Sequence, residues 1–267
     1  MKKHISVWML AARGTIFKVL SIFALMAAGQ IGIFRWAFSQ ALGEREAKIA
    51  QQALHPEYGT WEVPYPRLEK VLDWGTVNVT TVWIAAFLLV IAVLSTNGMA
   101  MSGNSRTRYT VQRLPIRERT FVIHTALYNF LVLIVFWGFS AAMTMVLCRM
   151  YYKAADPSAY GIQTTFLACY RNGLMHSLLP LEDISRYVRN LFMFVALALQ
   201  SAGCGFWNRR GKKSLAIIFV SLAFAINFAA NGVGTSSHDW LWILVGLLVS
   251  SWCSFNLLSY LGEGDQE

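Results

Sequence analysis

Six long stretches of apolar residues dominate the amino-acid sequence, and they constrain its fold more than any other feature. A helix needs about 20 mostly apolar residues to cross roughly 30 Å of hydrocarbon. Stretches approaching that length lie at residues 19–38, 79–101, 121–147, 188–207, 215–231 and 240–261. The sequence therefore predicts an all-α integral membrane protein with six transmembrane helices.

The composition agrees with this class and indicates the kind of partner. Of the 267 residues, 56% are apolar or aromatic and 14% are charged, whereas soluble domains carry about 25% charged residues. The net charge is +9, but the basic residues lie in short runs between apolar stretches rather than on one soluble face. We therefore expect membrane lipids and a cytoplasmic protein as counterions, and no nucleic acid.

The distribution of Lys and Arg predicts the orientation in the membrane. These residues collect in the N-terminal tail, at residues 106–119 and at residues 209–213. With six spans, all three regions fall on one side, which the positive-inside rule assigns to the cytoplasm. Both termini are therefore expected to be cytoplasmic.

The spans divide the chain into an expected interfacial helix at 1–18, a transmembrane domain at 19–261 and a cytoplasmic tail at 262–267. Trp8, Ala12 and Ile16 recur at helical spacing beside basic residues, which is typical of a helix lying on the membrane surface. A secretory signal peptide is the alternative interpretation of the first apolar stretch. Long exterior loops are expected at about 39–78 and 148–187, and a cytoplasmic connection at about 102–120.

The two exterior loops contain further expected features. Residues 44–54 predict a short helix, and a second piece should follow Pro64 and Pro66. Residues 160–179 are moderately apolar but contain Arg171, and a central arginine costs at least roughly 2.5 kcal/mol in a span. We expect an exterior helix or a shallow re-entrant segment there. Cys148 and Cys169 lie in this loop, and the sequence allows either a disulfide between them or two free thiols.

The sequence carries no recognisable catalytic, cofactor or metal site. The segment 205–214 resembles a phosphate-binding loop, but its second glycine is one position late and Lys213 replaces the hydroxyl residue. The histidines form no HExxH motif, and no GxSxG elbow occurs. Every Asp and Glu falls outside the predicted spans, which argues against proton-driven transport. The chain is not expected to be an enzyme.

Several amides are predicted to lie within the spans. They could line a substrate pathway, or they could form hydrogen bonds between helices, which is the commoner use of such groups. The candidate pathway residues are Gln30, Asn129, Asn227 and Asn231.

The most specific segment lies between the second and third spans, and its core is Arg113, Leu114, Pro115, Ile116, Arg117, Glu118 and Arg119. Proline suits the first turn of a helix, and exposed guanidinium groups pair with carboxylates of a partner. The core resembles the signature of ABC-2-type transporter permeases, in which this loop forms a coupling helix that contacts the ATP-binding subunit. An ordinary positive-inside loop would explain the arginines but not the Leu-Pro-Ile core.

A second segment, residues 176–190, resembles the one leading into the fourth span of small ABC-2-like permeases from Gram-positive bacteria. The resemblance implies a separate ATP-binding subunit that holds ATP and Mg, and a second permease chain forming a homodimer or a heterodimer. It also implies a multi-pass protein of the bacterial cytoplasmic (inner) membrane. The long loops here follow the first and third spans, unlike many members of that family.

Together these features predict the permease subunit of an ATP-driven exporter that moves an amphipathic cargo such as an antimicrobial peptide, a drug or a lipid. The complex, rather than this chain, would be the ATP-hydrolysing translocase. Two alternatives remain open from the sequence: a membrane scaffold or sensor that does not transport, and an ion-driven secondary transporter.

Overall fold

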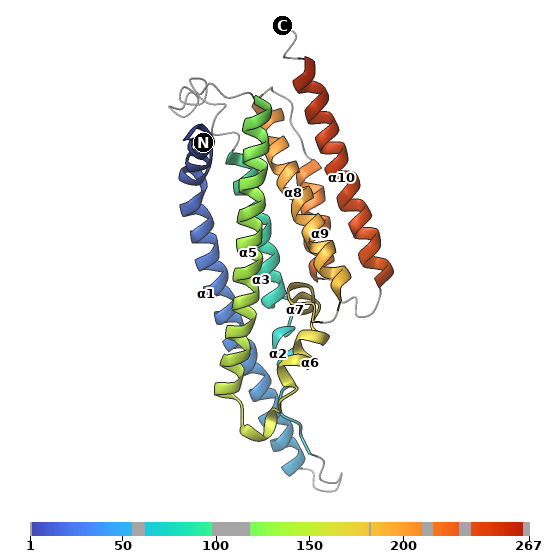
Figure 1. Cartoon of the computed structure of the whole chain (residues 1–267). Helices are drawn as coiled ribbons and strands as arrows, with labels where there is room; N and C mark the ends of the chain where they lie inside the picture. Colours follow the sequence, from blue (N-terminus) through green and yellow to red (C-terminus); the bar gives the residue numbers. More distant parts are fainter. Residues whose placement is uncertain are drawn as a thin grey trace.

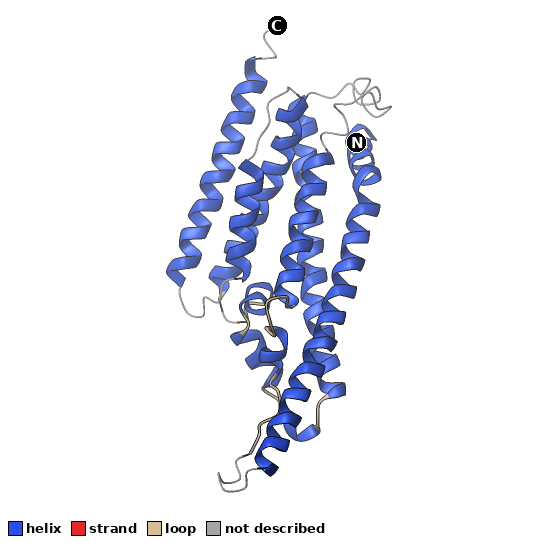
Figure 2. Ribbon diagram, turned by 180° about the vertical axis from the view of Figure 1, so that it is seen from behind, coloured by secondary structure: helices blue, strands red, loops and turns tan. Residues whose placement is uncertain are grey.

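The computed structural model describes residues 2–54, 62–97, 118–181, 183–209, 216–229 and 236–263. Within these ranges the chain is helical and contains no β-strand (Figures 1 and 2). The expected all-α class is therefore confirmed. The helices are α1 (Lys2–Leu54), α2 (Leu68–Leu72), α3 (Val79–Asn97), α5 (Glu118–Ala154), η3 (Pro157–Ala159), α6 (Thr164–Arg171), α7 (Gly173–Leu178), α8 (Ile184–Arg209), α9 (Ala216–Ala229) and α10 (Ser236–Glu263).

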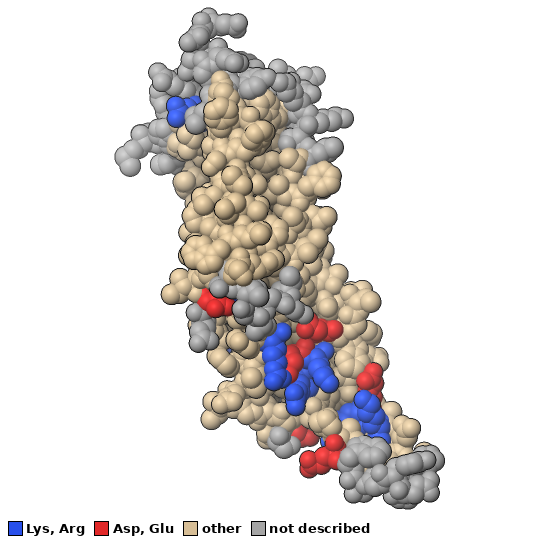
Figure 3. Space-filling view, turned by 90° about the vertical axis from the view of Figure 1, so that its right-hand side faces the viewer, with Lys and Arg blue, Asp and Glu red and all other residues tan. Residues whose placement is uncertain are grey.

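Five helices of the described chain are long and apolar enough to cross a membrane, namely α1, α3, α5, α8 and α10. The fifth predicted span, at residues 215–231, corresponds to α9, whose 14 described residues would rise only about 21 Å. On the face seen in Figure 3, a belt without charged side chains separates a small basic patch near one end from the charged side chains gathered toward the other. The multi-pass membrane class is consistent with this pattern.

Helix α1 differs from the arrangement that the sequence suggested. It continues through 53 residues, which correspond to about 80 Å. No turn separates the segment expected to lie on the membrane surface from the first span, and the short helix expected at residues 44–54 is the end of the same helix. The boundary expected at residue 18 thus has no counterpart in the backbone.

The long helices run roughly side by side, and both termini lie at the same end of the bundle (Figure 1). The last turn of α3, the first turn of α5 and the end of α8 also lie at that end. Short helices α2, α6 and α7 lie toward the opposite end, beside the extensions of α1 and α5. We call this opposite part, consisting of α2, η3, α6, α7 and the distal ends of α1 and α5, the distal subdomain.

Aromatic side chains fill the centre of the helix bundle. Trp83 of α3 is 1% exposed, and its ring packs against Phe87, Phe136 and Phe228 at centroid distances of 5.2–5.8 Å. The Trp83 indole nitrogen donates a hydrogen bond to the Ser140 hydroxyl at 3.0 Å. The one polar atom of this indole is thereby satisfied inside an apolar core, as buried tryptophan requires.

The distal subdomain has an apolar core of its own, which includes Phe38, Leu68, Tyr151 and Cys169. The Tyr151 hydroxyl donates to the Pro66 carbonyl oxygen at 2.7 Å, so it joins α5 to the segment before α2. The segment at 160–179, which the sequence left as an exterior helix or a re-entrant segment, forms α6 and α7 of 8 and 6 residues. Neither helix is long enough to cross a membrane.

Cys148 and Cys169 are both buried free thiols. Of the two alternatives that the sequence left open, a disulfide and free thiols, the structure has the free thiols.

Glycine positions show how closely the helices pack. A Cβ added at Gly246 of α10 would lie 3.4 Å from the backbone of Phe192 in α8, whereas one added at Gly32 would have no neighbouring heavy atom within 4 Å. A methyl group at Gly246 would therefore just touch α8, and a larger side chain would have to displace it.

Candidate functional site

Most of the predicted coupling segment lies outside the described residues. This applies to Arg113, Leu114, Pro115, Ile116 and Arg117. The described chain resumes at the next two positions of the segment, Glu118 and Arg119, which form the first turn of α5. The side chain of Arg119 is exposed. The helix ends that flank the segment lie at the same end as both termini (Figure 1).

The predicted pathway residues are buried but are not joined to one another. Gln30, Asn129 and Asn227 are at most 3% exposed, and Asn231 lies outside the described residues. The Asn129 amide nitrogen donates to the Ser201 hydroxyl at 2.7 Å and so links α5 to α8. Of the two interpretations, this contact corresponds to hydrogen bonding between helices.

Asn227 makes a similar link between α9 and α10. Its side-chain oxygen lies 3.1 Å from Nε2 of His238, and its nitrogen lies 3.5 Å from the sulfur of Met193. The side-chain oxygens of Gln30 and Asn129 have no hydrogen-bond partner in the described part of the chain. Within the described chain, no hydrogen bond joins two of these three amides.

A more concentrated group of polar residues lies where the helix bundle meets the distal subdomain. It brings together side chains from α7, the connection after it, the start of α8 and the start of α10. We call it the polar cluster, and its members are His176, Asp183, Arg186, Arg189, Asn190 and Asp239. All but Asp183 are at most 3% exposed.

Helical spacing explains why α8 contributes three members of the polar cluster. Arg186, Arg189 and Asn190 are separated by three and four residues, so they share the inward face of α8. Asp239 enters from the first turn of α10, where a carboxylate also benefits from the positive end of the helix dipole. Neither helix could bury its charged group alone, because an isolated charge in an apolar environment is very costly.

Ion pairs hold the cluster together. Nη1 of Arg189 donates to Oδ1 of Asp239 at 2.8 Å, and the Ser185 hydroxyl donates to Oδ2 of Asp239 at 3.2 Å. Nε of Arg186 lies 3.6 Å from Asp239 and 3.4 Å from Asp183. Two buried guanidinium groups therefore share one buried carboxylate and one partly exposed carboxylate.

The same cluster fixes the end of α7. The Asn190 amide donates to the Ser177 carbonyl oxygen at 2.7 Å, and the Trp137 indole donates to the Leu178 carbonyl oxygen at 3.0 Å. The last carbonyl groups of a helix have no partner within the helix. Side chains of α8 and α5 supply partners here, so α7 is tied to the helix bundle at its C-terminal end.

His176 faces the cluster from α7. Its Nε2 lies 3.3 Å from Oδ2 of Asp183. Burial lowers the pKa of His176 below its ordinary value of 6.5, the charge of Arg186 lowers this pKa further, and Asp183 acts in the opposite direction. A neutral imidazole facing a carboxylate carries its proton on Nε2, because a carboxylate only accepts hydrogen bonds. His176 is therefore neutral in the folded protein at neutral pH.

The chemistry of the cluster is that of a structural joint between helices. Within the described residues, no group of His, Cys, Asp and Glu side chains could hold a metal ion. A buried ion pair contributes little net stability but strongly penalises any arrangement that separates its partners. The polar cluster thus specifies how α7, α8 and α10 meet.

The sequence pointed to part of the polar cluster but not to Asp239. It placed every carboxylate outside the spans, but Asp239 lies within the apolar helix segment Ser237–Leu257 and is 2% exposed. The predicted span began one residue later, at Trp240, and Asp239 lies in the first turn of α10. Five of the six members lie within residues 176–190, the segment singled out by its family resemblance, and the sixth, Asp239, pairs with two of them. Two arginines at helical spacing beside an apolar stretch were the available signal.

Comparison with protein-family models, curated proteins and solved structures gave no match.

Proposed function

We propose that this chain is the permease subunit of an ATP-driven ABC-2-type exporter. The observation that carries the proposal is the Arg-Leu-Pro-Ile-Arg-Glu-Arg core at residues 113–119, between the second and third long apolar helices. A separate subunit would bind ATP and Mg, and this core would contact it as a short coupling helix. The cargo would be amphipathic, such as an antimicrobial peptide, a drug or a lipid.

The arrangement of helix ends supports this assignment. The segment at 98–117 connects α3 to α5, and the segment at 210–215 connects α8 to α9. The helix ends on either side of both segments lie at the end that holds the two termini (Figure 1). Both connections are rich in Lys and Arg, and short basic connections indicate the cytoplasmic side, which is where an ATP-binding subunit would be found.

We further propose that α9 is the sixth crossing, so that the transmembrane domain has six spans. An odd number of crossings would place the termini on opposite sides, whereas they lie at one end of the bundle. The described part of α9 packs against α3, α7 and α8. It is shorter than the other spans, and the residues on either side of it lie outside the described ranges.

A second permease chain would complete the pathway. Helices α1 and α10 lie at opposite edges of the bundle (Figure 1), and each exposes large apolar side chains. On α10 these include Leu244, Leu248, Trp252 and Phe255. Such surfaces must contact lipid or another apolar helix. A homodimer or heterodimer would use one of them and leave the other to the lipid.

The mechanism follows from the two ends of the bundle. ATP binding would close the partner subunits and move the α3–α5 end of this chain. The polar cluster would keep α8 and α10 attached to α7, so the bundle would move as a unit relative to the distal parts of α1 and α5. Coupling of this kind needs an element with two discrete arrangements.

The decisive experiment tests the coupling segment by copurification with the separate ATP-binding subunit that the proposal requires. Replacing Arg113, Arg117 and Arg119 together with Glu should abolish copurification of that subunit, because attraction becomes repulsion. The matched control is Lys153→Glu with Arg149→Glu, a charge reversal at the distal end of α5, which should leave copurification intact.

A second variant separates coupling from binding. Pro115→Gly removes the fixed backbone angle at the start of the proposed helix but keeps every charge. It should retain the ATP-binding subunit and hydrolyse ATP without matching transport. If both coupling variants insert and transport like the parent chain, the segment is only a topology signal and the transporter assignment fails.

Ion-driven transport is kept as a second candidate because of one observation. Asp239 is a buried carboxylate in an apolar helix and is paired with Arg189, and intramembrane carboxylates serve proton relays in secondary transporters. Liposomes containing this chain alone would distinguish the two. Cargo uptake under an ion gradient, without ATP or a partner subunit, would favour the second candidate.

A further inference from the structure

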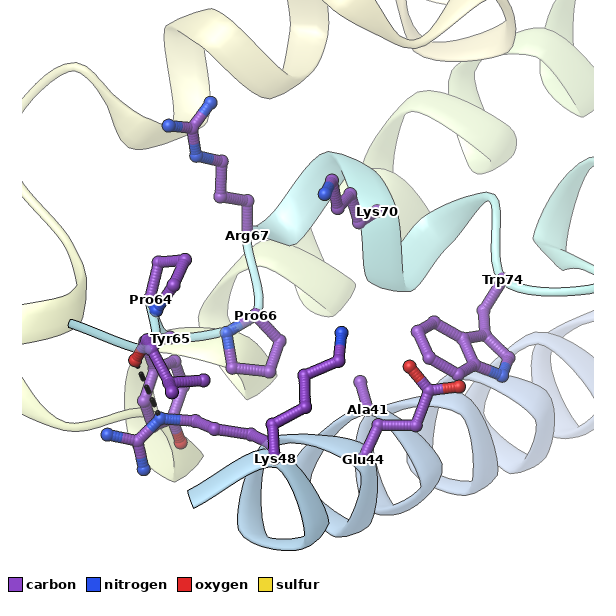
Figure 4. A pocket seen from close by; sticks show the side chains of 11 residues that line it. Ala41, Glu44, Lys48, Pro64, Tyr65, Pro66, Arg67, Lys70 and Trp74 are labelled. Carbon is purple, nitrogen blue, oxygen red and sulfur yellow. Dashed lines mark hydrogen bonds between the residues drawn. The ribbon is translucent and has the colours of Figure 1, made fainter. Parts of the chain in front are cut away.

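A pocket in the distal subdomain lies between α1 and the segment that leads into and out of α2. Its volume is about 330 Å³, which falls in the range of small-molecule sites. Figure 4 shows the side chains that surround it. They are Ala41, Glu44, Arg45, Lys48, Val63, Pro64, Tyr65, Pro66, Arg67, Lys70 and Trp74.

The pocket is strongly basic. Glu44, Arg45 and Lys48 are separated by one to four positions along α1 and line one wall, while Arg67 and Lys70 line the other. In Figure 4 the amino group of Lys48 points into the space between the walls, and Lys70 lies on the opposite side. Four cationic side chains therefore line the cavity, against one carboxylate, although the guanidinium of Arg67 points away from Lys48 in Figure 4.

These charges are not neutralised within the described chain. No described carboxylate forms an ion pair with Lys48, Arg67 or Lys70, and the nearby Glu69 is held by Arg171 at 2.9 Å. Uncompensated cations that converge on a cavity raise the local concentration of anions. The pocket thus has a net positive charge that no described carboxylate balances.

Aromatic groups give the pocket rigid apolar walls. The Arg45 guanidinium lies 5.4 Å from the centre of the Tyr65 ring, and its Nε donates to the Val63 carbonyl oxygen at 3.4 Å. These contacts hold Tyr65 and Arg45 in place before any ligand arrives. Trp74, which is half-buried, forms a further wall in Figure 4. A ligand with a flat apolar group would pack against these walls.

The position of the pocket indicates from where its ligand comes. The first apolar stretch, at residues 19–38, ends at Phe38. Lys48 follows 10 positions later, which is about 15 Å along the helix. The headgroup layer on each side of the hydrocarbon is only about 5–8 Å thick. Headgroups of lipids in the bilayer would not reach the pocket, whereas solutes in water would.

We propose that this pocket binds a phosphate-bearing organic anion that enters from the water at the distal end of the molecule. A phosphate ester carries close to two negative charges, and lysines on opposite walls can contact its oxygens from two directions. The site goes beyond the transport assignment and does not rest on it. It would allow the distal subdomain to respond to a solute on that side.

Protection of lysines from acetylation tests the site on the purified chain in nanodiscs of phosphatidylcholine. The probe is nitrophenyl phosphate, and mass spectrometry measures the acetylation rate at each lysine. We expect the probe to slow acetylation of Lys48 and Lys70 at least about fivefold and to leave Lys153 unchanged. Lys153 is the internal control, because it is exposed at the distal end of α5 but does not line the pocket. Absence of protection at Lys48 and Lys70 would overturn the proposal.

Calorimetric titration with the same probe tests which groups bind it. The double variant Lys48→Gln with Lys70→Gln should bind about tenfold more weakly or worse, whereas Lys153→Gln should bind like the parent chain. Nitrobenzoate, which has one negative charge, should bind more weakly than nitrophenyl phosphate. Equal affinity for the two compounds would refute the phosphate class.

A third experiment, with an anionic lipid, distinguishes phosphate on lipid headgroups from phosphate on a soluble molecule. Nanodiscs that contain phosphatidylglycerol, without any soluble probe, should leave acetylation of Lys48 and Lys70 unchanged relative to Lys153. Protection by the lipid would show that headgroups reach the pocket and would refute entry from the water. Neither experiment requires an ATP-binding subunit, so their failure is separate from failure of the transport proposal.

Discussion

The buried pair of Arg189 and Asp239 allows a quantitative test of the polar cluster. Replacing Asp239 with Asn removes the carboxylate shared by Arg186 and Arg189, which lie 3.6 and 2.8 Å from it. Arg186 then still has Asp183 at 3.4 Å, whereas Arg189 keeps hydrogen bonds to the Asn190 side-chain oxygen but no ion pair within the described residues. Leaving a buried charge unpaired costs about 3–5 kcal/mol. For a chain of this size the expected loss in Tm is roughly 6–20 °C, at about 2–4 °C per kcal/mol.

The opposite replacement should cost less. Arg189→Met leaves the Asp239 carboxylate with the Ser185 hydroxyl at 3.2 Å and with Arg186. The double variant removes both members, so neither a cation nor an anion loses its partner. We expect its Tm to recover much of what Asp239→Asn lost, with a coupling energy above about 1 kcal/mol.

Thermal unfolding of the purified chain in detergent, followed by tryptophan fluorescence, provides the measurement. The matched control is the ion pair of Arg171 and Glu69. Its nitrogen and oxygen atoms are 2.9 Å apart, similar to the Arg189–Asp239 pair, but the Arg171 side chain is 49% exposed. Breaking an exposed pair costs at most about 1 kcal/mol. If the losses at Arg189 and Asp239 simply add, or if the exposed pair costs as much, the cluster is not the joint described above.

Three further predictions follow from other parts of the molecule. Folding stability should decrease as the pH falls below about 6.5, because the unfolded chain protonates His176 before the folded protein does; His176→Gln should flatten the Tm profile there. In intact cells an impermeant thiol reagent should label Ile162→Cys, at a fully exposed site, but not Ser214→Cys, which is expected on the cytoplasmic side. The native cysteines are buried and should give little background, and labelling at 214 would contradict the topology. Gly246→Val should lower the free energy of unfolding by about 1–3 kcal/mol, whereas Gly32→Val, with open space around it, should not.

Much of the fold was predictable because it depends on local pattern. Apolar stretches of membrane length predict helices in almost any context, since backbone polar groups in lipid must pair within the helix. That argument located α3, α5, α8 and α10, and it recognised that residues 160–179 do not form a span. It did not predict that α1 continues unbroken for 53 residues. Periodicity marks where a face changes character, but it does not show whether the helix bends there.

The candidate sites were predictable only in part. The segment at 176–190 was identified from the sequence, and helical spacing places Arg186 and Arg189 on one face. Their carboxylate partner is Asp239, which is 50 positions beyond Arg189 in the chain. No local pattern links the two, because their contact depends on the rotation and approach of α8 and α10, which Gly246 permits.

The sequence by itself determined the class of the protein, the approximate positions of its long helices and the concentration of basic residues in a few connections. These properties follow from hydrophobicity and charge along the chain, which need no knowledge of long-range contacts. Only the tertiary structure decided that the distal ends of α1 and α5 form a subdomain with α2, α6 and α7. It also decided that Lys48 and Lys70, which are distant in the chain, face one pocket. Such sites arise from the packing of separate helices, and packing selects among many arrangements that share the same local pattern.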